Sequence, residues 1–582
     1  MFKKKLFSAI SLMMAMAMLL MLPACAAKAQ VSTSSSQNSS SEPMKVVQLD
    51  VFSASAASTT AAGVYDNTYW GKILKEQIGV SLNVLPTGDK AAEKLQALMA
   101  GGALPDIVIF NSTKDVENAI RGNMLVNLDD NLAKLPNVVK NAAKSMQFFR
   151  DNISTGTGKA YAVANGVGPA ELGTETSWGP YLRWDLYKAA GSPAINTFDD
   201  YLTTLKKMQG LQPATADGKK VYGITLWKDW DSTSMFLATE IGPTLGIDCG
   251  DQLGQLPFLQ VDFTNGTTMN TLDESSQYIQ ALKFYYKANQ MGLVDPDSLT
   301  QTWDTAKSKL TEGRVLFSWW DWYNDNYDTT AHTNGTTPTG FKAVFPANTK
   351  MLTLGDNNIG NTKTPIAISS ATKNLDACLK LVDFLYSVDG LQVLINGKEG
   401  TTWKLENGKP VLTTDGLKYA NDLTVEMADG GKWEDGRRVL GFTGLSIAFI
   451  NPKTTEALNS KLWTSSKKND IANQTKVDKD WTSVMGYQYT IDYAAAKKLT
   501  VTMPLAKSLI IPLTDDISAL ASKIGDIVKT YSWKMIFAKN EAEFNSLYAE
   551  MKTKAEGLGV KTVYDSSLKG WKTALTLAEK YK

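Results

Sequence analysis

Residues 313–325 contain the side chains best suited to bind a ligand. They read GRVLFSWWDWYND, a short apolar run followed by three tryptophans, an aspartate and a tyrosine. In an extended segment alternate side chains share a face, which would place Trp320 with Trp322 and Trp319 with Asp321. A core needs only one apolar face, so indoles on both faces predict that one face lines a cleft. The alternative is a strand end whose aromatic side chains cap the core.

Few other residues offer enzymatic chemistry. The only histidine, His332, lies in a loop rich in Thr, Asn and Gly, where a Ser-His-Asp triad would have to be built. A single histidine excludes HExxH and other multi-histidine metal sites. The segment 156–159 lacks the spacing of a phosphate-binding P-loop. A glycosidase needs only two carboxylates, and with 59 acidic residues the composition does not exclude one.

Size and composition describe a large globular protein. At 582 residues the chain is too long for one ordinary core, so we expect at least two large lobes. Its 60 basic and 59 acidic residues are interspersed, which argues against a strong attraction to nucleic acid. Tryptophan is abundant, with 15 residues, and an indole offers a flat apolar face and one N–H donor. That suits a ligand with flat apolar sides and polar edges.

Residues 1–25 have the pattern of an export signal. Lysines at positions 3–5 precede an apolar stretch, and LPAC ends at Cys25. These four residues resemble the lipobox of bacterial lipoproteins, in which the cysteine is diacylated and becomes the mature N-terminus. The alternative is an ordinary secretory signal cleaved nearby. Residues 26–43 would form a flexible Ser-rich tether, and no later segment is apolar enough to span a bilayer. We therefore expect a protein lipid-anchored at the extracytoplasmic face of the bacterial membrane.

The chain after the tether predicts alternating strands and helices. Strands are expected over 44–52, 80–84 and 107–110, and amphipathic helices over 70–78 and 91–99. This order opens an α/β fold with right-handed crossovers. Trp70 lies on the apolar face of the first helix and is predicted to be core. Cys249 and Cys378 could pair in an exported protein, but their spacing is equally consistent with two buried thiols.

Several segments together resemble family 1 extracellular solute-binding proteins, the substrate-capturing lipoproteins of bacterial ABC importers, and in particular their long LipO-like branch. The resemblance is carried, in chain order, by YWGKILKEQIGVSLNV at 69–84, KLQALMAGGALPDIV at 94–108, GKAYAV at 158–163, YLRWDLYKAAG at 181–191, KLTEGRVL at 309–316 and KNLDACLKLVDFLYS at 373–387.

The resemblance implies an α/β, two-lobed periplasmic-binding-protein fold of type II character, with the ligand held in a cleft between lobes joined by hinge strands. Lobe one would take residues 44–162 and 343–400, and lobe two would take 163–342 and 401–582. The chain would cross between the lobes near 161–164, near 341–346 and near Trp403. Some alginate-binding relatives carry a calcium loop after a helix pair. The corresponding segment 214–223 has one carboxylate and two lysines, too few oxygen ligands for calcium.

The resemblance selects the first of the candidate ligand-binding residues, and the positions of the predicted elements select the others. Its stacking tryptophan falls on the Trp-x-Trp segment, so Trp320 is the first choice, with Trp322 and Asp321 beside it, whereas Trp319 is left to the core. Phe110 ends a predicted parallel strand and Asn111 follows it, at the edge where ligands bind in such sheets. The remaining candidates lie in loops, near helix starts or at a predicted crossover: Trp178, Trp227, Trp230, Trp303, Arg183 and Trp403.

The implied function is a monomeric binding protein, not an enzyme, that captures an oligosaccharide and passes it to the ABC permease in its membrane. Sugar C–H groups pack on indoles, while hydroxyl groups need paired donors and acceptors at the rim. Binding would close the hinge. We expect no cofactor and no metal. The alternatives are a peptide or other solute in the same fold, or a surface glycoside hydrolase or adhesin.

Overall fold

The computed structural model describes residues 45–55, 62–86, 90–170, 175–176, 178–250, 256–421, 425–427, 431–432 and 442–581. Residues 45–582 form one compact unit. The lipobox with Cys25 and the tether 26–43 lie outside the described residues, so lipidation and the tether stay predictions. Within the described ranges, no helix has the length and apolarity needed to cross a membrane.

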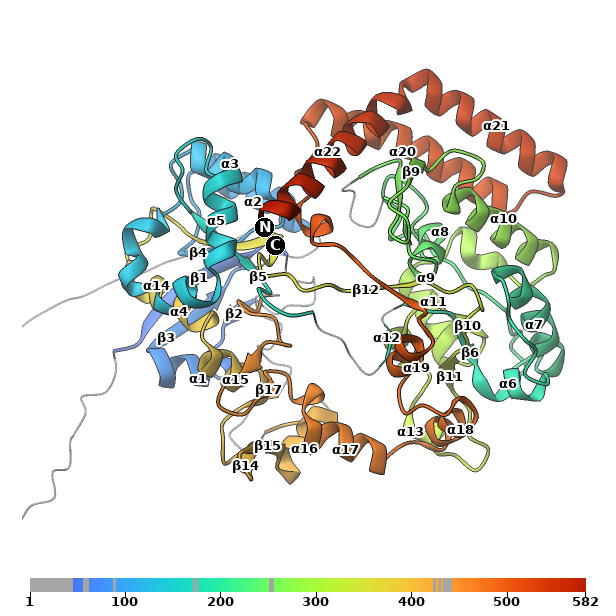
Figure 1. Ribbon diagram of the computed structural model, residues 1–582, viewed down its shortest axis with the longest axis horizontal. Helices are drawn as coiled ribbons and strands as arrows, with labels where there is room; N and C mark the ends of the chain where they lie inside the picture. Colours follow the sequence, from blue (N-terminus) through green and yellow to red (C-terminus); the bar gives the residue numbers. More distant parts are fainter. Residues whose placement is uncertain are drawn as a thin grey trace, which may run out of the picture. The chain divides into compact units, whose positions relative to one another are not determined.

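A six-stranded sheet is the first structural centre (Figure 1). Its strand order is β2-β3-β1-β4-β13-β5. Strands β3 and β4 run parallel to β1, β2 pairs antiparallel with β3, and β13 pairs antiparallel with both β4 and β5. The bounds are β1 (Val47–Ser53), β2 (Gly63–Val64), β3 (Val80–Val84), β4 (Ile107–Ile109), β5 (Ala162–Asn165) and β13 (Asn361–Ile368). The predicted β-α-β-α-β opening is confirmed, with α1 (Tyr69–Ile78) and α2 (Ala91–Ala100) as its helices.

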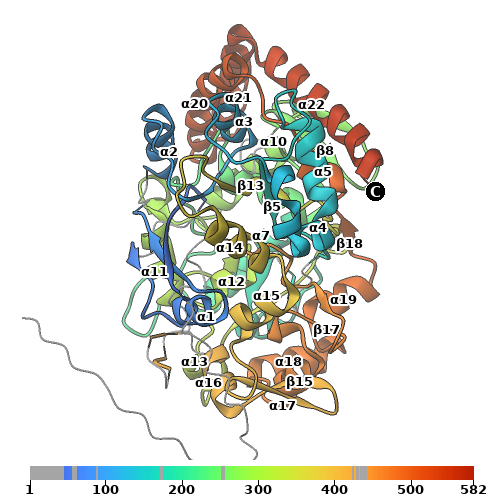
Figure 2. The same ribbon diagram turned by 90° about the vertical axis from the view of Figure 1, so that its left-hand side faces the viewer.

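Both faces of this sheet are buried, which explains its uninterrupted apolar strands. In β4, Ile107 and Ile109 belong to one core and Val108 to the other. The core that contains Ile107 also takes side chains from α1, α14 (Leu375–Leu385) and α15 (Val388–Asn396). The opposite core takes side chains from α2, α3 (Thr113–Arg121), α5 (Ala143–Asn152) and α22 (Val560–Tyr581). The helices around the sheet can be followed in Figures 1 and 2.

Helix α1 shows how local sequence sets the element ends. The Thr68 side chain accepts a hydrogen bond from the Gly71 N–H, and the helix ends at Gly79, whose φ of 67° is left-handed. Trp70 is 3% exposed in the core, as predicted. Cys249 and Cys378 are both buried but belong to different hydrophobic cores, and they form no disulfide with each other.

The second structural centre is a small antiparallel sheet, β10-β6-β11, surrounded by helices. Its strands are β6 (Tyr181–Arg183), β10 (Phe317–Ser318) and β11 (Phe341–Ala343). The helices that contribute to its core include α6 (Trp184–Ala189), α7 (Phe198–Leu211), α8 (Phe236–Thr239), α10 (Gln277–Gln290), α11 (Trp303–Thr311), α18 (Lys476–Met485), α20 (Asp515–Ile536) and α21 (Glu541–Leu558). Helices α20 and α21 contact each other extensively, and both contact α22 (Figure 1).

The chain passes between the two sheets more than once. After β5 it reaches β6, and after β11 it returns to β13. Between β11 and β13, β12 (Met351–Thr353) pairs parallel with β18 (Thr500–Thr502). The predicted boundary at residue 401 does not follow core membership, because Tyr419, Leu445 and Leu458 pack in a core of the six-stranded sheet. A crossover near Trp403 is therefore wrong. Trp403 begins β14 (Trp403–Glu406), which pairs with β15 (Lys409–Leu412) as a hairpin.

Candidate ligand-binding site

The aromatic segment leaves the extended conformation earlier than predicted. Strand β10 ends at Ser318, and Trp320 is the last extended residue, with φ −139° and ψ 142°, before the short helix α12 (Asp321–Asn324). Trp319 is 4% exposed and its Nε1 donates a hydrogen bond to the Tyr285 hydroxyl at 3.0 Å. The assignment of Trp319 to the core is confirmed.

Five of the predicted tryptophans meet in one group, here called the tryptophan cluster: Trp227, Trp230, Trp303, Trp320 and Trp322. The Trp320 and Trp322 rings stack with centroids 5.2 Å apart and planes 23° apart. The Trp230 and Trp303 centroids are 4.7 Å apart. Trp227 lies 5.0 Å from Trp303 and 6.0 Å from Trp320, so it connects the two pairs. Residues nearly a hundred positions apart in the chain thus form one aromatic surface.

Backbone pairing places the elements that carry this cluster. The segment before Trp227 makes isolated parallel bridges: Tyr222 pairs with Val315 and Ile224 with Val294. The chain before α11 is held by a buried ion pair, with Lys309 Nζ 2.6 Å from an Asp295 carboxylate oxygen. The three segments that lead to Trp227, Trp303 and Trp320 are therefore neighbours in space.

A carboxylate fixes the start of α11. The Trp303 backbone N–H, at the first turn of this helix, donates to Asp229 Oδ2 at 2.7 Å. A negative charge at a helix N-terminus is favourable because backbone N–H groups there lack intrahelical acceptors. Asp229 precedes Trp230, so this one contact ties the loop that carries Trp230 to the helix that carries Trp303.

Exposure is graded across the cluster. Trp227 is 2% exposed and Trp320 4%, Trp230 and Trp303 are partly buried, and Trp322 is 45% exposed. Two aromatic rings stack on Trp320: Phe236, with centroids 6.1 Å and planes 26° apart, and Trp322. Its Nε1 donates to Glu240 Oε2 at 2.9 Å. The structure therefore places Trp320 behind Trp322, not at the surface as predicted, and Trp322 is the open platform.

Carboxylates lie beside this platform. Asp321 is partly buried, and its pKa is raised to about 6, first by burial and further by the Glu175 and Asp325 carboxylates, while the Trp322 N–H lowers it. Among the described residues, no lysine or arginine lies within ion-pair distance of Asp321 or Asp325. Lys342 instead pairs with Asp478 at 2.5 Å and lies 3.8 Å from Glu175. The rim of the platform next to Trp322 is therefore acidic.

Three predicted site residues are structural. Arg183 is 1% exposed, forms two hydrogen bonds with the Asp185 carboxylate and lies 4.5 Å over the Tyr327 ring. Phe110 is fully buried in a core of the six-stranded sheet. Trp403 is 7% exposed and donates from Nε1 to the Gly397 carbonyl at 2.8 Å. The prediction is wrong for these three because their side chains are enclosed and cannot reach a ligand.

Two predicted residues keep accessible surface outside the cluster. Trp178 is partly buried against the core of the small sheet, and the next residue, Gly179, donates its N–H to the Trp319 carbonyl. Asn111 is partly exposed and directly precedes Ser112, the N-cap of α3. Ligand binding by either residue stays a prediction.

The sequence did not single out three residues that support the cluster. Phe236 stacks on Trp320, Glu240 accepts its N–H, and Tyr323 donates from its hydroxyl to the Ala306 carbonyl at 3.1 Å. Glu240 is 1% exposed. A buried carboxylate needs a hydrogen-bond donor, so an isolated acidic residue within the apolar run 235–247 was an available signal.

The described part of the chain shows no group of three or more His, Cys, Asp or Glu side chains suited to holding a metal ion. In the segment 214–223, Asp217 lies 3.2 Å from Lys219, so its one carboxylate is already paired with a cation.

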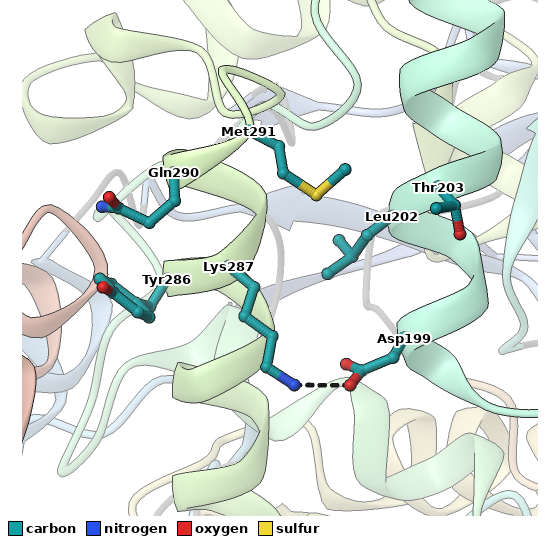
Figure 3. Close-up of a pocket in the computed structure, with 7 residues that line it drawn as sticks. All are labelled: Asp199, Leu202, Thr203, Tyr286, Lys287, Gln290 and Met291. Atoms are coloured by element: carbon teal, nitrogen blue, oxygen red, sulfur yellow. Dashed lines mark hydrogen bonds and ion pairs between the residues drawn. The ribbon is translucent and has the colours of Figure 1, made fainter. Parts of the chain in front are cut away.

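A groove between α7 and α10 contains none of the predicted ligand-binding residues (Figure 3). It has a volume of about 380 Å³. Figure 3 shows Leu202 and Met291 between the two helices, while Lys287 Nζ reaches Asp199 at 2.5 Å.

Residues 56–392 match the family described as bacterial extracellular solute-binding protein. No match was found among curated proteins. Among solved structures, the HMO-binding, ABC-transporter-associated solute-binding protein of Bifidobacterium longum infantis has 16% identity and a TM-score of 0.57, covering 90% of this chain and 98% of its own.

Two structures from Streptococcus pneumoniae are similar in the same way. The ABC-transporter substrate-binding protein FusA, in complex with kestose, has 15% identity and a TM-score of 0.59, covering 91% of this chain and 100% of its own. The N-glycan transport solute-binding protein NgtS has 16% identity and a TM-score of 0.54, covering 91% and 99%. These likenesses show the fold, and the predicted two-lobed α/β architecture is confirmed.

Proposed function

Because this chain belongs to the bacterial extracellular solute-binding proteins, we propose that it captures an oligosaccharide and delivers it to the permease of an ABC importer. Proteins of similar fold are named as binding HMO, as complexed with kestose and as transporting N-glycans. Members of this family are transport proteins, so the chain binds its solute without turning it over. The Cys25 lipid anchor would keep it, as a monomer, beside the permease.

One observation carries the choice of a sugar. Trp322 presents an exposed indole whose inner side is stacked on the buried Trp320 at 5.2 Å. A flat, rigid indole matches the C–H face of a pyranose ring. The Asp321 carboxylate next to it supplies acceptors for hydroxyl groups, and a carboxylate–hydroxyl hydrogen bond is stronger than one between neutral groups.

The platform is preorganised. The Trp322 ring centroid also lies 5.7 Å from that of Trp303 and 6.2 Å from that of Trp230. These contacts restrict the Trp322 side chain, so it loses little further freedom when a ligand stacks on it. The segments that join the two sheets would provide the hinge, and ligand binding would stabilise the closed arrangement.

Thermal unfolding and tryptophan fluorescence, measured against panels of oligosaccharides, monosaccharides and peptides, test the proposal. An oligosaccharide at about 100 times its Kd should add about 2.7 kcal/mol to the free energy of unfolding. Trp322→Ala should weaken oligosaccharide binding at least tenfold while the protein still folds, with a melting temperature lowered only by the loss of its ring contacts. Leu211→Ala, which removes an equally exposed apolar side chain at the end of α7, is the matched control.

Three results would contradict this function. A response to peptides without any response to glycans would indicate another solute. Release of reducing ends from a bound glycan would indicate a hydrolase. Unchanged glycan affinity in the Trp322→Ala variant would place the sugar elsewhere.

A further inference from the structure

A further pocket lies beside the loop that carries Trp230. It has a volume of about 570 Å³ and is formed by this loop, one residue of the 3-10 helix η3 (Pro296–Leu299), the outer face of α20 and the start of α21. This is within the range of about 300–1,000 Å³ that is typical of small-molecule sites. Its apolar lining consists of Leu299, Trp533, Phe537 and Leu547. We call it the basic pocket because of the lysines at its rim.

Three lysines and two carboxylates line the basic pocket, and both carboxylates already accept hydrogen bonds. Asp231 Oδ2 accepts from Trp533 Nε1 at 2.7 Å, and Glu543 Oε2 accepts from the Lys539 N–H at 2.7 Å. The third lysine, Lys529, lies 3.2 Å from the largely exposed Asp526 outside the lining.

The other two lysines lie against aromatic rings. Lys228 Nζ is 5.1 Å from the centre of the Trp533 ring, and Lys534 Nζ is 5.0 Å from the centre of the Tyr531 ring. Within the described ranges, neither ammonium group lies within ion-pair distance of a carboxylate. A cation over an aromatic face is attracted by the ring but keeps its hydrogen-bond donors for another partner. The lining therefore combines an apolar floor with three lysines against two carboxylates, a net charge of +1.

We propose that the basic pocket is a second binding site, which takes a small anion attached to an apolar ring or short chain. The anionic group, a carboxylate or sulfonate, would lie between Lys228 and Lys534, and the apolar part would contact Leu299, Phe537 and Leu547. Neutral ligands of the same shape would lose the charge-assisted hydrogen bonds. This site is separate from the tryptophan cluster and does not depend on the identity of the solute.

The structure also connects the two sites. Asp231 accepts from Trp533 on the floor of the basic pocket through Oδ2, and from the Phe236 N–H through Oδ1 at 3.0 Å. Phe236 stacks on Trp320. Asp231 thus links Trp533 to Phe236, which supports the tryptophan cluster. An anion that contacts Trp533 or Lys228 should therefore change the tryptophan fluorescence of the protein.

Isothermal titration of the mature protein with 1-naphthoate and its uncharged analogue 1-naphthamide tests this site. We expect naphthoate to bind at least tenfold more tightly than the amide. The double variant Lys228→Ala/Lys534→Ala should reduce naphthoate affinity at least tenfold with an unchanged melting temperature. Lys523→Ala, which removes an exposed lysine from the same helix outside the pocket, should bind as the unmodified protein does.

Four outcomes would overturn the proposal. These are no binding of naphthoate, equal affinity for acid and amide, unchanged affinity in the double variant, and loss of naphthoate binding in Trp322→Ala. The last result would mean that the probe binds the tryptophan cluster. A double variant that fails to fold would be replaced by Lys228→Gln/Lys534→Gln, which keeps the aliphatic stems and removes only the charges.

Discussion

The acidic rim beside Trp322 predicts that the site discriminates against acidic glycans, and Asp321→Asn should relax this discrimination. Asp321 is partly buried with no cation within ion-pair distance among the described residues, and its pKa of about 6 leaves it mostly ionised at pH 7.5. Asp321 directly precedes Trp322 in α12, and we expect a ligand that stacks on Trp322 to come close to this carboxylate.

Coulomb's law gives the size of the effect. Two unit charges roughly 6 Å apart repel by about 0.7 kcal/mol in bulk water and by about 3 kcal/mol at the effective dielectric of a protein surface. A carboxylated sugar should therefore bind roughly 3- to 150-fold more weakly than a neutral sugar of the same shape. Asp321→Asn should therefore raise the affinity for the carboxylated sugar by most of this factor. The neutral sugar should lose only one charge-assisted hydrogen bond.

Titration calorimetry on matched pairs of neutral and carboxylated oligosaccharides measures this discrimination. Asp389→Asn, which removes a largely exposed carboxylate in α15, serves as the control. Lowering the pH to 5 protonates Asp321 while the glycan carboxylate stays ionised, so the discrimination of the unmodified protein should fall. Glu175 and Asp325 lie nearby, and the pKa of Asp325 is also raised by burial, so part of the effect belongs to them.

Equal discrimination in the unmodified protein and in Asp321→Asn would refute the reasoning, since the Asp321 charge would then be remote from the bound sugar. Tighter binding of acidic than of neutral glycans by the unmodified protein would refute it more directly.

Three further changes test separate parts of the structure. Trp320→Ala should lower the free energy of unfolding by about 3–5 kcal/mol, because it empties a buried site between Phe236 and Trp322, and urea unfolding measures this loss. Asp328→Asn should raise the melting temperature at pH 8 but not at pH 4. Burial raises the Asp328 pKa to about 7, so the folded state loses stability as the pH rises from about 4 to 7; equal effects at both pH values would contradict this cause. Cys25→Ala should move the protein from the detergent-rich to the aqueous phase in phase partitioning, and retention in the detergent phase would rule out an anchor at this cysteine.

The first half of the six-stranded sheet was predictable because its pattern is local. Alternating apolar residues in β3 and an uninterrupted run in β4 identify strands, and Gly79 marks the end of α1. The insertion of β13 between β4 and β5 was not predictable, since the pairing of Ile366 with Ile109 joins positions far apart in the chain. The predicted lobe of residues 401–458 was wrong for the same reason, because no local pattern of apolar residues shows which of two cores a segment joins.

The tryptophan content of the sequence pointed to an aromatic site, but the order of the residues did not show which of its tryptophans is exposed. Alternation in an extended segment predicted that Trp320 and Trp322 share a face, and they do stack, although α12 is helical at Trp322. Which of the two is exposed depends on Phe236 and Glu240, about eighty positions away. Arg183 was misassigned because the sequence does not show that its guanidinium pairs with Asp185 inside the core.

The graded exposure of the tryptophan cluster explains how it forms a rigid surface. A single exposed indole on a loop would be mobile and would lose side-chain entropy when a ligand stacks on it. Here Trp227 and Trp320 are held in the core, and Trp322, which is 45% exposed, is stacked against Trp320. Most of the ordering of this surface therefore takes place when the protein folds, before any ligand arrives. We therefore expect the buried tryptophans to govern stability and the geometry of the surface, while the proposed function assigns the choice of sugar to Trp322 and the carboxylate of Asp321.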